Sequence, residues 1–88
     1  MGRQFQHMVC ISVQDRVTIA NGQWLGPDVP ENERTQAHIE ACPRVWDFLQ
    51  RAGDDGWELV AVLETRTEIQ RNVQFIRTLY LKRDVTPA

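Results

Sequence analysis

The sequence predicts an α+β domain with one antiparallel sheet of about four to five strands and one main helix packed on one face. Three observations predict this class. Apolar and polar residues alternate near both ends of the chain, as in strands. Asn21-Gly22 marks a hairpin between two short β-prone runs. One helical apolar stripe follows Pro43. The expected order is β-β-β-α-β-β, which makes residues 1–88 a single small domain with residues 83–88 as a tail.

The first three strands are expected in the first third of the chain. Residues 5–13, FQHMVCISV, alternate, so Met8 and Cys10 share one face and the odd-numbered positions share the other. The Asn-Gly pair that follows tolerates the positive φ angles of a type I′ turn. Residues 17–20 should therefore pair antiparallel with residues 23–25.

The main helix is expected from Pro43 to Ala52, because proline suits the first turn of a helix. Gly53 is expected to end it as a left-handed cap. The preceding residues 26–42 lack a strong pattern. A structureless loop of that length is uncommon in a compact domain and is often functional. A lid, a dimer arm and a short helix are all open as interpretations.

The last two strands are expected over residues 57–69 and from Val73 to about Arg83, joined by a loop at residues 70–72. The middle of the first of these strands is apolar on both faces. This pattern predicts a central strand that is covered on both sides.

The face of the sheet away from the helix is also expected to be apolar. The alternation assigns six side chains to it: Met8, Cys10, Val60, Val62, Ile76 and Tyr80. Apolar patches of several hundred Å² usually mark an interface. We therefore expect a homodimer through this face, or a short second helix from residues 33–42 that covers it.

A motif after the helix resembles a known family. Residues 56–60 are Gly-Trp-Glu-Leu-Val, and residues 80–83 are Tyr-Leu-Lys-Arg. The two stretches are similar to the pattern of small bacterial proteins known as domain of unknown function 4177, with the closing residues shifted by one position. The resemblance covers roughly residues 43–83 and the first strand, whereas the Asn-Gly hairpin has no place in it. It implies a compact α+β domain of bacterial origin and carries over no catalytic residue.

Composition excludes several classes of function. The net charge is −2, which argues against bulk electrostatic binding of nucleic acid. The first ten residues lack the apolar run of a signal peptide, and no stretch is long enough to span a bilayer. We therefore expect a cytoplasmic protein in which Cys10 and Cys42 are reduced.

The sequence predicts no cofactor, metal or catalytic site. His38 and Cys42 are four residues apart, but a structural zinc needs four ligands and the chain offers no second suitable pair. The glycines do not form a phosphate-binding loop, and Ser12 has no base near it in the sequence.

Four residues are candidates for ligand binding: Arg77, Tyr80, Trp24 and His38. Arg77 shares a face with apolar residues and so needs a partner, either Glu64, Asp47 or an anionic ligand, unless a bulge turns it outward. Trp24 precedes the long loop and is either a recognition anchor or packed on the sheet edge.

Two functions follow from these observations. The first is a small module without catalysis that self-associates and binds a protein or a small molecule. The alternative is a small dimeric enzyme or ligand-binding protein with its site at the subunit interface. Binding of nucleic acid by the sheet, through Tyr80, Lys82 and Arg83, is the least favoured.

Overall fold

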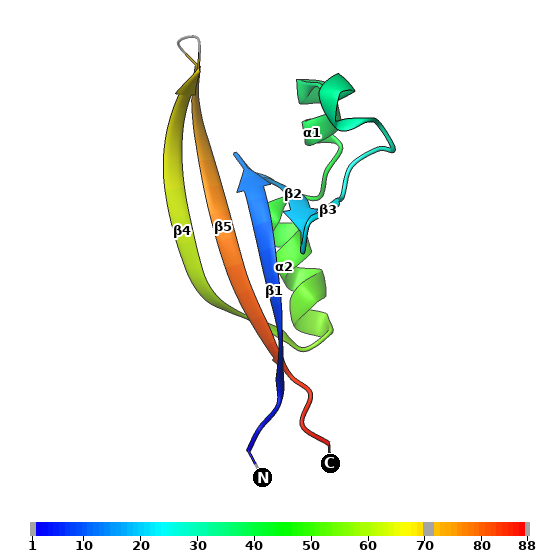
Figure 1. Cartoon of the computed structure of the whole chain (residues 1–88), viewed down its shortest axis with the longest axis vertical. Helices are drawn as coiled ribbons and strands as arrows, with labels where there is room; N and C mark the ends of the chain where they lie inside the picture. Colours follow the sequence, from blue (N-terminus) through cyan, green and yellow to red (C-terminus); the bar gives the residue numbers. More distant parts are fainter. Residues whose placement is uncertain (1, 70–71, 88) are drawn as a thin grey trace.

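In residues 2–69 and 72–87, which the computed structural model describes, the chain forms one open antiparallel sheet of five strands and one main helix (Figure 1). The strands are β1 (Phe5–Val13), β2 (Arg16–Ala20), β3 (Gln23–Trp24), β4 (Trp57–Ile69) and β5 (Asn72–Asp84). The main helix is α2 (Val45–Asp54). The spatial order β3-β2-β1-β5-β4 confirms the predicted α+β class.

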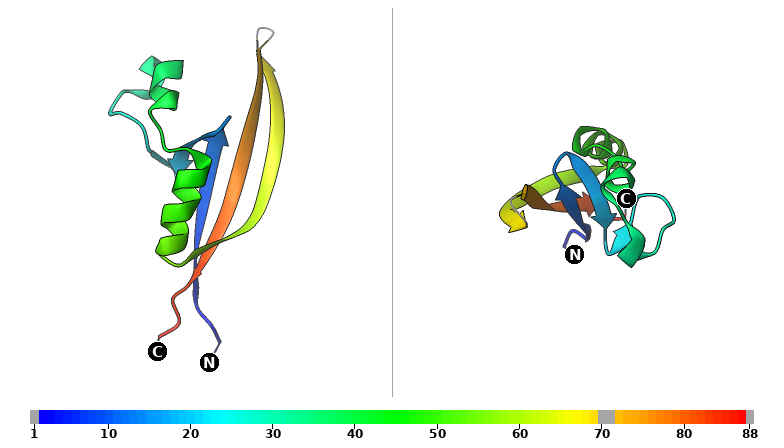
Figure 2. Two further views of the ribbon diagram at one scale, coloured as in Figure 1. Left: turned by 180° about the vertical axis from the view of Figure 1, so that it is seen from behind. Right: turned by 90° about the horizontal axis from the view of Figure 1, so that it is seen from above.

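The molecule is elongated, with extents of 52 × 26 × 20 Å. β1 stops at Val13, which lies opposite Ile76 of β5. Beyond this point β4 and β5 continue as a two-stranded ribbon that projects past the rest of the sheet (Figures 1 and 2). An isolated two-stranded ribbon is marginally stable in water. Of the predicted loop at 70–72, residues 70 and 71 lie outside the described ranges, and Asn72 is the first residue of β5.

The predicted Asn-Gly hairpin is confirmed. Asn21 and Gly22 have φ angles of 49° and 81°, as a type I′ turn requires. The Asn21 amide also ties the turn to β1. The Asn21 side-chain oxygen accepts from the Val9 N–H at 2.8 Å, and the Asn21 backbone N–H donates to the Val9 carbonyl at 2.8 Å.

The helix α2 begins two residues later than predicted. The Pro43 carbonyl instead accepts from the Val17 N–H at 2.8 Å, and the Val45 N–H donates to the Asp15 carbonyl at 2.9 Å. These two bonds fix the start of α2 against the turn between β1 and β2.

The predicted end of the helix is wrong. Gly53 lies inside α2, and the positive φ of 90° falls on Gly56, three residues later. The acidic pair continues the last turn, since the Asp55 N–H donates to the Ala52 carbonyl at 3.0 Å. The glycine that can adopt a left-handed backbone is therefore used where the chain turns into β4.

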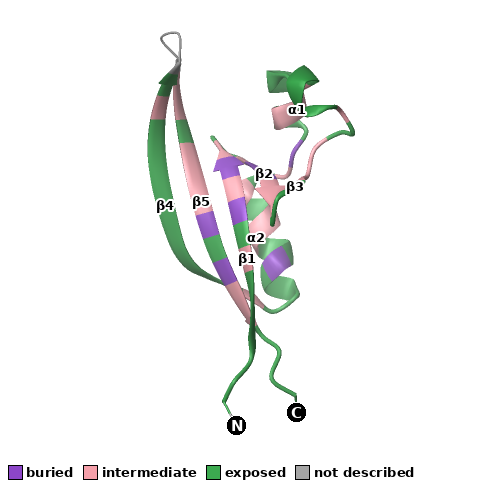
Figure 3. Cartoon of the chain, viewed as in Figure 1, coloured by how far each residue is buried: buried purple, intermediate pink, exposed green. Residues whose placement is uncertain are grey.

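The core lies between α2 and one face of the sheet. Its buried members are Cys10, Val17, Ala52, Leu79 and Leu81. Cys10 lies opposite Leu79 and Met8 lies opposite Leu81, and directly opposite residues of antiparallel strands share a face. Figure 3 shows these buried positions on β1, β5 and α2. The prediction that Met8 and Cys10 face away from the helix is therefore wrong.

The strand β4 has its predicted bounds but not its predicted place, because it lies at the edge of the sheet. Every residue from 58 to 66 is exposed (Figure 3). The register shifts between Leu59 and Ala61, so Val60 is an extra residue. Such a bulge puts every later side chain on the opposite face from the one that simple alternation along the strand predicts. Val62 consequently faces the helix side, whereas Ala61 and Leu63 face away from it.

The predicted loop contains a 3₁₀ turn, η1 (Glu31–Glu33), and a short helix, α1 (Gln36–Glu40). Both lie beside the β2–β3 end of the sheet (Figure 2). The prediction that a helix in residues 33–42 covers the second face is wrong, because the described chain leaves that face open. No helix in the described ranges has the length and apolar character needed to cross a membrane.

Candidate interaction surface

The sheet has an apolar side that faces away from α2. The residue pairing assigns to it Val9, Ile11, Val13, Ile19, Ala61, Leu63, Ile76 and Tyr80, which we call the open face. Its exposed members include Leu63 at 60%, Val9 at 40% and Tyr80 at 37%. Contiguous apolar patches of several hundred Å² on a soluble protein usually mark an interaction site.

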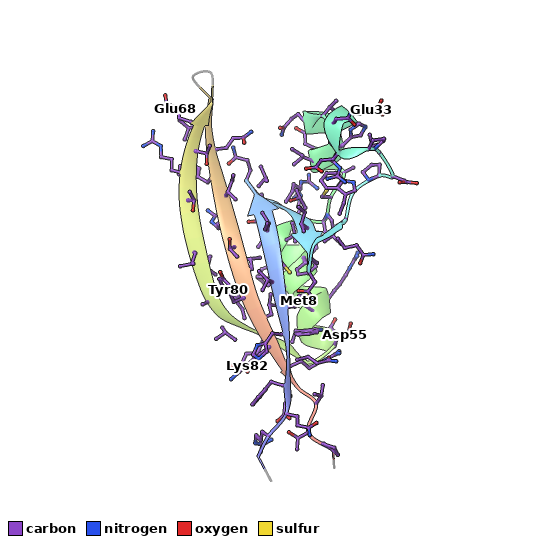
Figure 4. The ribbon with its side chains drawn as sticks, viewed as in Figure 1. Met8, Glu33, Asp55, Glu68, Tyr80 and Lys82 are labelled. Carbon is purple, nitrogen blue, oxygen red and sulfur yellow. The ribbon has the colours of Figure 1, made fainter. Side chains whose placement is uncertain are left out.

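The open face contains two of the six predicted interface residues, Ile76 and Tyr80. Figure 4 labels Tyr80 on β5 and Met8 on β1, whose side chain packs instead on the core with α2. Val60 is the bulge residue, and Val62 faces the helix side. Alternation alone could not show that the six residues lie on different faces of the sheet, because the bulge and the strand pairing decide which face each side chain is on.

A second exposed apolar region lies on the helix side of β4. Val62 is 45% exposed there, and Leu59 is 41% exposed. β4 therefore carries exposed apolar residues on both of its faces.

The accessible surface is large for the mass of the chain. A folded monomer of 10.2 kDa exposes about 5,300 Å². This chain exposes 6554 Å². The radius of gyration is 14.8 Å, against about 12 Å for a compact domain of this length. The thin core and the projecting hairpin account for both differences.

The structure does not bring the four candidate ligand-binding residues together. Arg77 and Tyr80 lie on opposite faces of the sheet. Arg77 lies 3.7 Å from Glu64, which is one of the two predicted partners, and both side chains are partly exposed. It also donates to the Gln14 carbonyl at 3.5 Å. Arg77 is thus placed in a partly exposed ion pair.

Trp24 and His38 organise the segment that joins β3 to α2. The Trp24 indole N–H donates to the Pro27 carbonyl at 2.7 Å, and the Arg34 guanidinium lies 4.2 Å above the ring. A Cβ at Gly26 would lie 2.5 Å from this ring. His38 Nδ1 accepts from the Thr35 N–H at 2.9 Å at the start of α1. Both side chains therefore make local contacts that order the loop.

A shallow cavity of about 350 Å³ lies between α2 and the sheet, and the sequence did not predict it. Met8, Leu25, Phe48 and Trp57 contribute its apolar wall, and Arg51 and Asp55 add one charge of each sign. Its formation depends on strand pairing between distant segments, so no local pattern in the sequence could reveal it.

The Trp57 ring of the GWELV motif has a structural partner on β5. The Arg83 guanidinium lies 4.5 Å from the ring centroid and donates to the Asp55 carbonyl at 3.3 Å. It also donates to the Gln6 side chain. Arg83 therefore links the helix end, β1 and β4, which explains by packing why Trp57 and Arg83 stand at the two ends of the motif.

The cysteines are buried and free. Burial raises the pKa of the Cys10 thiol to about 11, from an ordinary value of 9.0. Burial also raises the pKa of the Cys42 thiol. A thiol of this kind is protonated near neutral pH and is a poor nucleophile. Among the residues described, no three His, Cys, Asp or Glu side chains are grouped to hold a metal ion.

Comparison with known protein families, curated proteins and solved structures finds no match to this chain. The resemblance to the domain of unknown function 4177 family stays a prediction that rests on the GWELV motif.

Proposed function

We propose that this protein is an interaction module without catalysis, which self-associates through the open face and thereby forms a surface for a partner. The observation that supports it is the apolar character of the open face, which spans β2, β1, β5 and β4. Leu63, Val9 and Tyr80 are each exposed by more than a third.

The excess of surface agrees with an interface of ordinary size. The chain exposes 6554 Å², about 1,200 Å² more than a typical monomer of its mass. A standard protein interface removes about 800 Å² from each partner. Pairing two open faces would therefore bring the exposed area close to the usual value.

A matched pair of valine substitutions tests this proposal. Val9 lies on the open face and is 40% exposed, whereas Val85 lies beyond β5 and is 38% exposed. Val9→Glu would bury a charge in the interface, so the sedimentation coefficient should shift toward the value of the monomer. Val85→Glu should leave it unchanged. Circular dichroism shows whether each variant is folded, and Leu63→Glu on the edge strand repeats the test if Val9→Glu does not fold.

Wild-type protein that sediments as a monomer at all accessible concentrations would contradict the proposal. So would equal behaviour of the two valine variants, since self-association would then not involve the open face.

The cavity beside α2 favours a second candidate, the binding of a small apolar molecule. Its volume of about 350 Å³ lies at the lower end of ligand sites. Ala52→Leu would place a larger side chain in its wall. A ligand retained by wild-type protein in native mass spectrometry should be lost from this variant, and retention by both would place the ligand elsewhere.

A further inference from the structure

We propose that β4 pairs edge to edge and antiparallel with β4 of a second copy of this chain, so that the two sheets join. This surface is distinct from the open face, because it uses the backbone edge of β4 rather than the apolar side chains of the open face.

The residues of β4 are typical of a strand with neighbours on both sides. The run from Leu59 to Leu63 is continuously apolar, a pattern found in buried central strands. In the structure described for this chain, β4 pairs with β5 alone. A second strand would give β4 the neighbour on its other side that its composition favours.

The free edge is also long and regular after its bulge. Edge strands present unpaired N–H and C=O groups that can pair with another strand. Beyond the bulge at Val60, nine consecutive residues, 61–69, pair with β5 without a further shift in register. A second copy offers the same regular edge, which makes the contact isologous.

Charge complementarity favours a register centred on Thr65. Glu64 and Arg66 lie on the helix side, opposite Arg77 and Phe75 of β5. A two-fold axis at Thr65 places Glu64 opposite the partner's Arg66, and Arg66 opposite the partner's Glu64. Opposite charges in directly facing positions stabilise a strand pair. A two-fold axis at Glu64 would instead place Glu64 opposite the partner's Glu64, which is destabilising.

This register uses the regular part of the strand from end to end. Pairing about Thr65 matches Ala61 with the partner's Ile69, so the paired segment starts directly after the bulge. The surface excess of about 1,200 Å² is larger than the roughly 800 Å² that one standard interface removes from a chain, which leaves area for a second contact.

Two threonine-to-cysteine variants test the pairing. In the proposed register Thr65 lies opposite the partner's Thr65, at a Cα separation of about 4.5–5.5 Å, which a disulfide can bridge. Thr67 lies opposite the partner's Leu63, so two Thr67 positions are about 14 Å apart along the strands. Thr65→Cys should form a linked dimer under mild oxidation, and Thr67→Cys and wild type should not. The native Cys10 and Cys42 are 0% and 1% exposed and should not compete.

The outcomes separate this inference from the open-face proposal. Sheets stacked face to face lie about 10 Å apart, too far for a disulfide between equivalent strand positions. A link in Thr67→Cys but not Thr65→Cys would overturn the proposed register. No link in either variant would overturn edge pairing, and self-association of wild type that depends on Val9 would still support the open face.

Hydrogen exchange of wild-type protein gives a second readout without a substitution. The backbone amides of residues 61–69 that point away from β5 should become protected as protein concentration rises. Fast exchange at all concentrations would overturn the pairing.

Discussion

The two sides of the sheet contain similar residues in different surroundings. On the helix side, α2 covers Leu79, which is 2% exposed. On the open face, Leu63 is 60% exposed although it is the same residue type on the neighbouring strand. The covered side forms the core, whereas the open face and β4 remain apolar surface. The difference indicates that a single chain supplies one layer of helix for a sheet whose residues suit two covered faces.

The largest effect that tests this comparison is expected from truncating one leucine on each side. Leu79→Ala should lower the free energy of unfolding by about 2–5 kcal/mol, because it leaves a cavity in the core. Leu63→Ala should change the stability of the dilute monomer by less than about 0.5 kcal/mol. Urea unfolding at low protein concentration measures both. Equal losses in the two variants would show that Leu63 is already covered within the chain.

The buried thiol of Cys10 gives the covered side a dependence on pH. Its pKa is about 11 in the folded chain and 9.0 when unperturbed. As pH rises from 9 to 11, the unfolded thiol loses its proton before the folded one does. Stability from this group is therefore fully present below pH 9 and is lost toward pH 11. Urea midpoints should fall over this range, and less steeply in Cys10→Ala. Parallel slopes in the two proteins would show that the thiol is not buried.

The covered side also contains a buried hydroxyl group, and removing it should stabilise the fold. The Ser12 side chain is buried, and its hydroxyl has no hydrogen-bond partner among the described residues. An unsatisfied buried hydroxyl costs about 1–3 kcal/mol. Ser12→Ala should therefore raise the free energy of unfolding by about 1 kcal/mol, after the loss of some packing. A clear loss of stability by urea unfolding would show that the hydroxyl is satisfied in solution.

The smallest effect is expected from the ion pair between β4 and β5. Arg77 and Glu64 are both partly exposed, and pairs of this kind contribute about 0–1 kcal/mol. Arg77→Met should leave the urea midpoint nearly unchanged. Any small difference in stability between wild type and Arg77→Met should decrease at high salt, because salt screens the ion pair. A large loss would instead show that Arg77 is buried in an assembly.

Local patterns in the sequence were sufficient for the five strands and for the approximate place of the main helix, but not for the ends of that helix. The Asn21-Gly22 pair located the β2–β3 hairpin because few residues tolerate its backbone angles. The apolar run from Trp57 gave β4 its bounds. Glu64, one of the two partners predicted for Arg77, lies 3.7 Å from it.

The faces and the strand order could not be predicted in the same way. The pairing of Cys10 with Leu79 joins residues far apart in the sequence, and it decides that Met8 and Cys10 face the helix. The bulge at Val60 moves Leu63 to the open face, and alternation cannot reveal an inserted residue. The cavity beside α2 depends on the same long-range pairing.

The most direct test of self-association is native mass spectrometry of gently purified wild-type protein. The account predicts a species of twice the chain mass of 10.2 kDa, or a higher even multiple if both surfaces are used. Any additional mass would report a retained ligand. A single species at 10.2 kDa over all accessible concentrations would contradict the account, because the open face and the edge of β4 would then remain exposed in solution.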